Sequence, residues 1–324
     1  MTPLARSTAT AEWAPAHTLR GRGDGVDVAE ALQRRSAGGQ RVRRILRKQM
    51  KTGLEQLNGG RASDEDIHEA RKRIKQARAT LRLLREALSG ADYQRQERTL
   101  RRAAQPLSAA RDAKVLVEAL DSLRARYRSV RHVKGGQRFR RALLRVRVQA
   151  RRRALTDAAG VPQTRKLLQE ARTRAKNWTL QHNGWRRLAK GAVRRYAKGR
   201  DALRDVRRQR SAEQLHHWRK QAKYLYLQLE LLTPITAQSI ARQARQLHSL
   251  SDDLGEDHDL AMLHQRVAAH MRDFPNELQG SPLLRAIERS RSKLQSKALL
   301  RGSRLYRRPP GRLARRLGVQ CSSA

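Results

Sequence analysis

A basic helical motif occurs twice in this chain, and every residue that defines the first copy recurs 148 positions later. The two copies are His68-x-x-Arg71-Lys72-x-x-Lys75 and His216-x-x-Arg219-Lys220-x-x-Lys223. A serine suited to cap a helix stands before each copy, Ser63 before the first and Ser211 before the second. A repeat at a fixed offset indicates that one structural unit is used twice.

A second repeated segment supports the same interpretation. Its two copies are Leu107-Ser108-x-x-Arg111-Asp112 and Leu254-Gly255-x-x-His258-Asp259, at an offset of 147 residues. Two independent segments in the same order, with nearly equal offsets, predict an internal duplication.

Helical patterns fill most of the chain after residue 39, and no stretch alternates as a β-strand would. The later prolines fall near the ends of these patterns, where helices stop or start. The spacing predicts helices over residues 40–57, 64–88, 92–105, 109–128, 137–157, 164–182, 185–209, 212–232, 236–253, 258–272 and 281–306. We therefore expect an all-α fold.

The motif places its cations along one face of a helix. On a helical wheel, the first copy and its extension share an arc of roughly 120°: His68, Arg71, Lys72, Lys75, Arg78 and Arg82. The second copy repeats the arc with His216, Arg219, Lys220 and Lys223. An apolar face borders each basic stripe, as Ile67 and Ile74 do in the first copy. We therefore expect both stripes to line a groove between packed helices.

The charge balance indicates a polyanionic partner. Lys and Arg total 73 against 29 Asp and Glu, for a formal net charge of +44. Nucleic acid, inorganic polyphosphate and an anionic membrane all satisfy this excess. A run of charge on a helix is usually a solvated face. Here, however, the stripe is duplicated and nearly free of acids that could pair with it.

The histidines and acids of the motifs do not predict a metal or cofactor site. Surrounding cations oppose a bound metal ion, and no carboxylate stands at ligand spacing on the stripe. We expect Asp112 and Asp259 to brace helix starts and to pair with the basic stripes. No Ser/His/Asp order and no phosphate loop is present, so we expect no enzymatic activity. A metal-dependent phosphohydrolase using His68, His216 and the acids of residues 252–259 remains the enzymatic alternative.

The hydropathy of the sequence predicts neither a membrane span nor a secretory signal. No apolar run approaches the roughly 18 residues of a membrane span, and the first twenty residues lack a secretory core. We expect a soluble cytoplasmic protein with a flexible arm over residues 1–25 and a basic disordered tail over residues 307–324. Cys321 is the single cysteine, which excludes an intramolecular disulfide.

The motifs resemble those of the CHAD family, the conserved histidine α-helical domain. Residues 67–75 and 216–223 are similar to its two signature helices, and residues 110–116 and 254–260 to its two acidic segments. The resemblance covers about residues 26–306. It implies two pseudo-symmetric antiparallel helical bundles, residues 26–160 and 161–306, around a basic central groove or pore. It also implies binding of inorganic polyphosphate and association with polyphosphate granules.

Carried onto this chain, the resemblance assigns polyphosphate contacts to both basic stripes. It adds four further positions: Arg44, Lys48, Arg194 and Arg195. Tyr226 stands where the first copy has Arg78, which predicts a weaker second stripe. The alternating glutamates of triphosphate-hydrolysing domains are missing, so hydrolysis is not implied. The alternative function is nonspecific binding of RNA or DNA.

Overall fold

The computed structural model describes residues 37–58, 62–181, 184–233, 236, 238–273, 278 and 282–319. Over these residues the chain forms twelve α-helices and one short 3-10 helix, with no strand. The expected all-α fold is confirmed. The predicted arm over residues 1–25 and Cys321 both lie outside the described residues.

The helices follow the predicted segments closely. They are α2 (Gly38–Glu55), α3 (Asp64–Leu83), η1 (Leu84–Glu86), α4 (Gly90–Ala104), α5 (Ser108–Arg126), α6 (Arg128–Arg131), α7 (Gly136–Thr156), α8 (Val161–Lys176), α9 (Trp185–Arg208), α10 (Ala212–Leu232), α11 (Gln238–Asp273), α12 (Pro282–Leu305) and α13 (Pro310–Arg316). Both motif helices begin as their sequences predict. The Ser63 and Ser211 hydroxyls accept hydrogen bonds from the backbone amides of Asp66 and Gln214, each at 3.1 Å.

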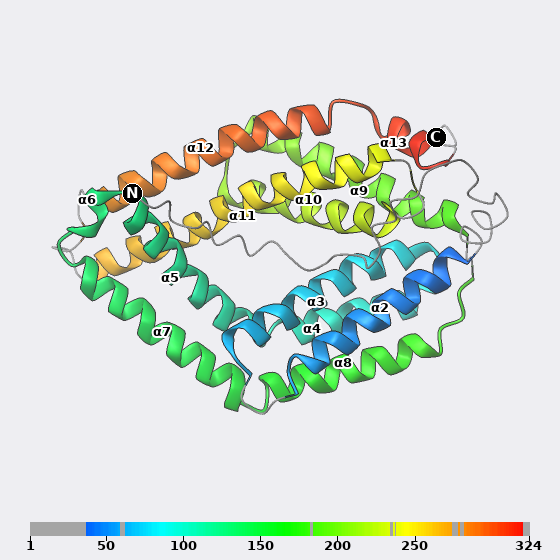
Figure 1. Ribbon diagram of the computed structural model, residues 1–324, viewed down its shortest axis with the longest axis horizontal. Helices are drawn as coiled ribbons and strands as arrows, with labels where there is room; N and C mark the ends of the chain where they lie inside the picture. The colour runs from blue at the N-terminus through cyan, green and yellow to red at the C-terminus, as the bar shows by residue number, and fades with distance from the viewer. Residues whose placement is uncertain are drawn as a thin grey trace, which may run out of the picture.

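The first motif helix, α3, belongs to a group formed with α2, α4 and α8 (Figure 1). Its apolar residues Ile67, Ile74 and Leu81 are all buried there, as the wheel predicts. Helix α8 is joined to α4 by a buried hydrogen bond, in which the Gln96 side chain donates to the carbonyl of Ala171 at 3.0 Å. Helix α8, which begins the second of the two bundles that the family resemblance implies, packs against α2 and α4 of the first.

The second motif helix, α10, packs between α9 and α11 (Figure 1). Its apolar face is buried as expected, including Leu215, Leu225 and Leu229. One large apolar core joins the two motif helices, because α3 and α10 also touch each other. This shared core fixes the orientation of each basic stripe relative to the other.

A smaller core lies toward the other end of the molecule. Here α5, α6 and α7 pack against the second half of α11 and the start of α12, with Phe139 and Leu263 among the buried residues (Figure 1). This packing places α5 beside both α3 and α11.

Helix α11 corrects one sequence prediction. Two helices were expected over residues 236–253 and 258–272, yet Gln238–Asp273 is a single helix of 36 residues. Gly255 lies inside this helix, where a Cβ would touch the Arg219 side chain. Asp259 therefore lies in the middle of a helix, and the expectation that it braces a helix start is wrong.

The C-terminal segment corrects another. The tail over residues 307–324 was predicted to be disordered, but its described part forms α13 against α9. Leu313, Leu317 and Val319 are buried, and the Trp185 indole donates to the carbonyl of Leu317 at 2.8 Å. The many arginines of this segment led to the prediction of disorder, although the segment also contains apolar residues. Among the described helices none is long and apolar enough to cross a membrane.

Candidate functional site

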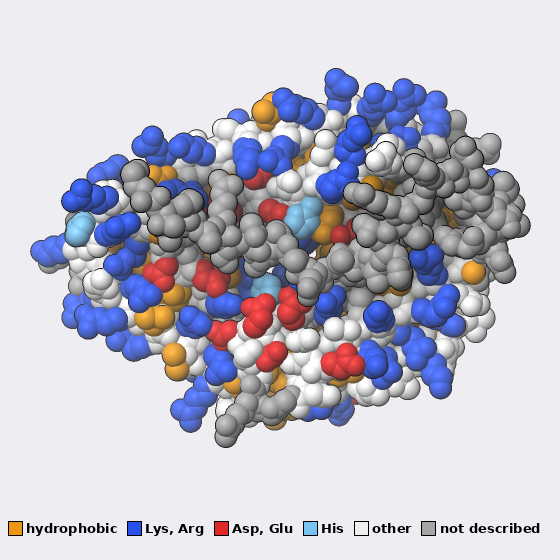
Figure 2. All heavy atoms as spheres, in the orientation of Figure 1, with side chains coloured by type: hydrophobic (Ala, Val, Ile, Leu, Met, Phe, Trp, Pro, Cys, Tyr) orange, Lys and Arg blue, Asp and Glu red, His pale blue; other side chains and the backbone are white. Residues whose placement is uncertain are grey.

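A cavity of about 1150 Å³ lies between α3, α4, α5, α9, α10 and α11. Twelve Lys and Arg residues line it: Arg71, Lys75, Arg78, Arg82, Arg98, Arg101, Arg111, Arg126, Arg195, Arg219, Lys220 and Lys223. Six carboxylates share the wall: Glu97, Asp112, Glu118, Asp252, Glu256 and Asp259. Lys and Arg side chains spread over much of the face in Figure 2, whereas acids gather toward its middle.

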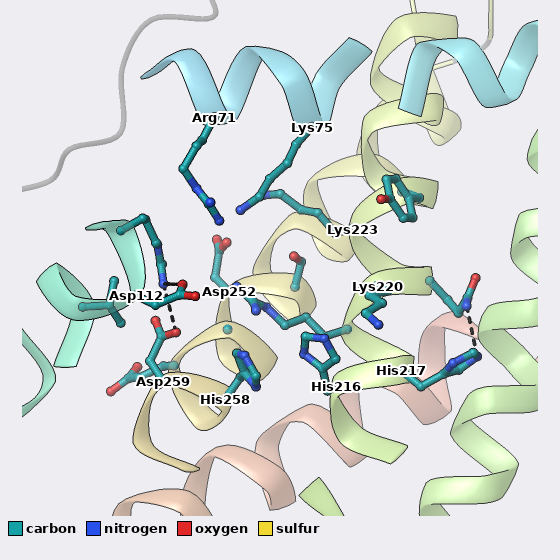
Figure 3. Close-up of a pocket in the computed structure, with 18 of the residues that line it drawn as sticks. Arg71, Lys75, Asp112, His216, His217, Lys220, Lys223, Asp252, His258 and Asp259 are labelled. Atoms are coloured by element: carbon teal, nitrogen blue, oxygen red, sulfur yellow. Dashed lines mark hydrogen bonds and ion pairs between the residues drawn. The ribbon is translucent and has the colours of Figure 1, made fainter. Parts of the chain in front are cut away.

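The two copies of the motif converge on this central cavity. Arg71 and Lys75 reach in from α3 and point toward Lys223 of α10, with Lys220 further along α10 (Figure 3). Arg71 also donates to the Ser108 hydroxyl at 2.6 Å, which holds its guanidinium beside α5. Equivalent residues of the two repeats thus face one another across one space.

Lys75 lies at the centre of the converging cations. Its side chain is exposed to the cavity, and the motif cations lie close around it. Loss of hydration, followed by the charges of Arg71, Arg219, Arg111 and Lys223, lowers its pKa to about 7. The pKa of Lys223 is also lowered, first by loss of hydration. The cations here repel each other, and an anion among them would relieve that repulsion.

The second repeated segment forms the acidic side of the cavity. Arg111 of α5 pairs with Asp259 of α11 at 3.4 Å and with Asp112 at 3.9 Å, so the two equivalent segments meet directly. The predicted pairing of these aspartates with the basic stripes is replaced by their pairing with Arg111. Since each aspartate is within the field of Arg71 or Arg219, the acids still partly offset the motif charges.

Two histidines stack beside these acids. The rings of His216 and His258 lie 4.3 Å apart between centroids, and the Nδ1 atom of His216 is buried without a hydrogen-bond partner among the described residues. Loss of hydration and the neighbouring His258 lower the pKa of His216 to about 4. The pKa of His258 is lowered as well, mainly by burial. Both rings are therefore neutral near pH 7 and act as polar, uncharged wall groups.

The opposite end of the cavity is held by paired arginines. Arg78 and Arg82 both donate to Glu97 at 2.7 Å, and the Arg82 guanidinium lies 4.0 Å from the centre of the Tyr224 ring. Arg195 donates to Gln221 at 2.6 Å. These contacts hold the guanidinium groups in fixed positions. Fixed guanidinium groups favour an anionic ligand whose oxygens match their geometry.

The CHAD domain family model matches residues 31–268. The chain belongs to the CHAD domain family. No curated protein matches it in sequence.

Two solved structures share the CHAD fold of this chain. The crystal structure of the CHAD domain from the plant Ricinus communis matches with a TM-score of 0.55 at 14% identity, covering 89% of this chain and 93% of that one. PptA from Streptomyces chartreusis matches with a TM-score of 0.61 at 17% identity, covering 83% and 99%. At these identities the likeness concerns the fold.

Five residues expected at the site of this CHAD protein do not line the cavity: His68, Lys72, Arg44, Lys48 and Arg194. Lys72 pairs instead with Glu69 at 2.9 Å. Arg44 and Lys48 are exposed on α2, and Arg194 pairs with Glu86 at 2.8 Å. Tyr226, the counterpart of Arg78, donates to Glu230 at 3.0 Å and also stays outside.

Other lining residues were missed as candidate contacts. They include Arg98 and Arg101 of α4 and Arg126 of α5, whose sequence surroundings are too basic to single them out. Arg111 and His258 were visible as members of the second repeat, and that repeat was the signal that could have placed them here.

The acids of residues 252–259 divide between two faces of α11. Asp252 faces the cavity, whereas Asp257 accepts from Arg291 at 3.0 Å and Asp253 pairs with Lys297 at 2.8 Å, both on α12. Among the described residues no group of three or more His, Cys, Asp or Glu side chains is arranged to hold a metal ion.

Proposed function

We propose that this CHAD protein binds inorganic polyphosphate in the central cavity, and that it acts by binding rather than by catalysis. The observation that carries the proposal is the convergence of Arg71, Lys75, Arg219 and Lys223 from the two motif copies. We further propose that the copies arose by duplication and form two pseudo-symmetric halves, and that binding attaches the protein to polyphosphate granules in the cytoplasm.

A linear inorganic chain suits this arrangement of cations. Unit charges 4 Å apart interact by about 1 kcal/mol in bulk water and about 4 kcal/mol at an effective dielectric constant of about 20. A cavity that partly excludes water therefore strengthens each phosphate contact. Arginine can make two hydrogen bonds to one phosphate, while a lysine such as Lys75 follows the chain as a mobile charge.

The cavity wall is poorly suited to nucleic acid. Nonspecific single-strand binders stack bases on aromatic rings. Of the described residues that line the cavity, Tyr224 is the one Phe, Trp or Tyr, and Arg82 and Arg195 already lie over its ring. Nucleic acid binding remains the second candidate because Arg141, Arg145 and Arg152 form an exposed row on the outside of α7.

A competition experiment separates the two functions. Affinities for long-chain polyphosphate, tRNA and duplex DNA would be measured at equal phosphate, from about 50 to about 500 mM salt. We expect polyphosphate binding to survive at salt that strips both nucleic acids, because the cavity adds shape to charge. Equal loss of all three would contradict a shaped site and leave a generic polyanion surface.

The affinity for polyphosphate should fall as the pH rises. In the free protein Lys75 has a pKa of about 7, and a bound phosphate favours its charged form, so its pKa rises on binding. Binding therefore takes up a proton, so affinity is greatest below pH 7 and weakens progressively as the pH rises from 7 toward the raised pKa of the bound state. We expect about a tenfold weakening between about pH 7 and about pH 9, measured by calorimetry in buffers of different ionisation enthalpy.

The Lys75→Arg variant is the matched control, because arginine keeps its charge over this whole range. Its affinity should change much less with pH, and its binding should take up fewer protons. The neutral His216 and His258 give no charge to lose in this window. An unchanged pH profile in Lys75→Arg would remove Lys75 from the explanation.

A further inference from the structure

A second, smaller cavity lies where α9, α11, α12 and α13 meet, and it is lined by arginines. Its volume is about 160 Å³, against about 1150 Å³ for the central cavity. Six guanidinium side chains line it: Arg242, Arg304, Arg307, Arg308, Arg312 and Arg316. Among the described residues that form its wall there is no carboxylate.

The missing acids set this cavity apart from the central one, where six carboxylates offset part of the positive charge. Arg316 donates to the side-chain oxygen of Gln243 at 2.9 Å, which is a neutral acceptor. The pKa of Arg316 is lowered, first by loss of hydration and then by the charge of Arg308. The described wall residues therefore hold like charges close together with no carboxylate among them.

The arginines stand on an ordered support. The Tyr196 hydroxyl of α9 lies within hydrogen-bonding distance of the carbonyl oxygens of Leu305, at 3.0 Å, and Arg308, at 2.8 Å. The buried Tyr306 ring packs on Tyr196, with 5.2 Å between the ring centres. Leu313 of α13 is also buried. These contacts fix the turn that carries Arg307 and Arg308 between α12 and α13.

We propose that this arginine cavity binds a compact phosphate anion of about one to three phosphate groups. Its small volume favours a short ligand, and its concentration of guanidinium groups calls for a ligand with several charges in a small volume. A monocarboxylate brings one charge, whereas each phosphate group offers several oxygens that guanidinium groups bind in pairs. The first turn of α11, at Ser239, adds the positive end of a long helix to the wall.

Two sources could supply such a ligand: a free small phosphate compound, or the terminal phosphates of a polyphosphate chain. The site itself does not depend on polyphosphate binding in the central cavity, because none of its six arginines lines that cavity. The two proposals can therefore fail separately.

The test uses inorganic pyrophosphate and tripolyphosphate as probes, titrated into the full-length protein by calorimetry. The site variant is Arg308→Gln with Arg312→Gln, two exposed residues for which we expect intact folding. The matched control is Arg141→Gln with Arg145→Gln, which removes the same charge from the exposed face of α7. A third variant, Arg71→Gln with Arg219→Gln, weakens only the central cavity.

We expect the site variant to lose roughly tenfold or more in affinity for the small probes, while the α7 control binds them as the wild type does. A binding event that survives in the central-cavity variant would place the probe in the arginine cavity. Weak, equal losses in the site variant and the α7 control would overturn the proposal, as would no binding of either probe to the wild type.

Long-chain polyphosphate then distinguishes the source. If its affinity also falls in the Arg308→Gln, Arg312→Gln variant and pyrophosphate competes for part of its binding, the cavity takes chain ends. If its affinity is unchanged while pyrophosphate binding is lost, the cavity takes a free small phosphate compound. Both outcomes support the site, and circular dichroism confirms that each variant keeps its helices.

Discussion

Reversing the charge of Arg71, Lys75, Arg219 and Lys223, each to Glu, is expected to abolish polyphosphate binding. These four residues are two pairs of equivalents from α3 and α10, and all four line the central cavity. A hydrogen bond to a charged group contributes about 1.5–3 kcal/mol, so loss of even two of them weakens binding by at least about 100-fold. Four carboxylates would in addition repel the chain. Affinity for long-chain polyphosphate, measured by calorimetry, checks the prediction.

The variant should keep its fold, because eight other Lys and Arg residues of the described cavity wall remain to offset the four new carboxylates. The matched control reverses four exposed cations outside the cavity: Arg141, Arg145, Lys166 and Lys190, each to Glu. It has the same net charge as the site variant. Retained binding in the control and lost binding in the site variant assign affinity to the cavity. Equal loss in both would show that net charge alone drives binding.

The repeat predicts the central residues of the site. Its constant offset identifies equivalent residues, and the helical period places them on one face of each motif helix. Each stripe borders a buried apolar face, so packing α3 against α10 must bring the stripes together. The repeat cannot predict which of these cations form ion pairs with acids of the same helix. Lys72 is drawn to Glu69 one turn earlier, but the second copy has His217 at that place. Lys220 therefore lacks this partner and lines the cavity.

The remaining misses have a similar physical origin. Arg44 and Lys48 were assigned by resemblance, which fixes a position in a sequence but not the face of α2 that is buried. Leu46 and Met50 occupy that face, so the two cations point to solvent. The C-terminal segment was expected to be disordered because it contains few apolar residues and many arginines. Two of those apolar residues, Leu313 and Leu317, are nevertheless buried. Burial depends on which elements pack opposite: α3 and α8 pack against α2, and α9 packs against α13.

Replacing Trp218 with alanine is expected to lower the free energy of unfolding by about 3–5 kcal/mol. Trp218 is fully buried on α10 and stands directly before Arg219, so its ring anchors the second motif helix. The indole packs against α12 at Gly302. The free energy of unfolding would be measured by urea denaturation. A change below about 1 kcal/mol would contradict the close packing of this ring.

Gly302 shows why this contact tolerates so little change. A Cβ at Gly302 would lie 2.4 Å from Cζ2 and 2.6 Å from Cη2 of Trp218, which no real contact allows. Gly302→Ala should therefore destabilise the protein by about 1–3 kcal/mol, because the buried ring cannot move aside freely. Phenylalanine lacks the outer ring that carries these atoms. Gly302→Ala should consequently cost much less in a Trp218→Phe background than in the wild type, and a double-mutant cycle measures that difference. Equal costs in the two backgrounds would mean that α12 does not lie against the indole as described, and that the orientation of α10 depends on other contacts.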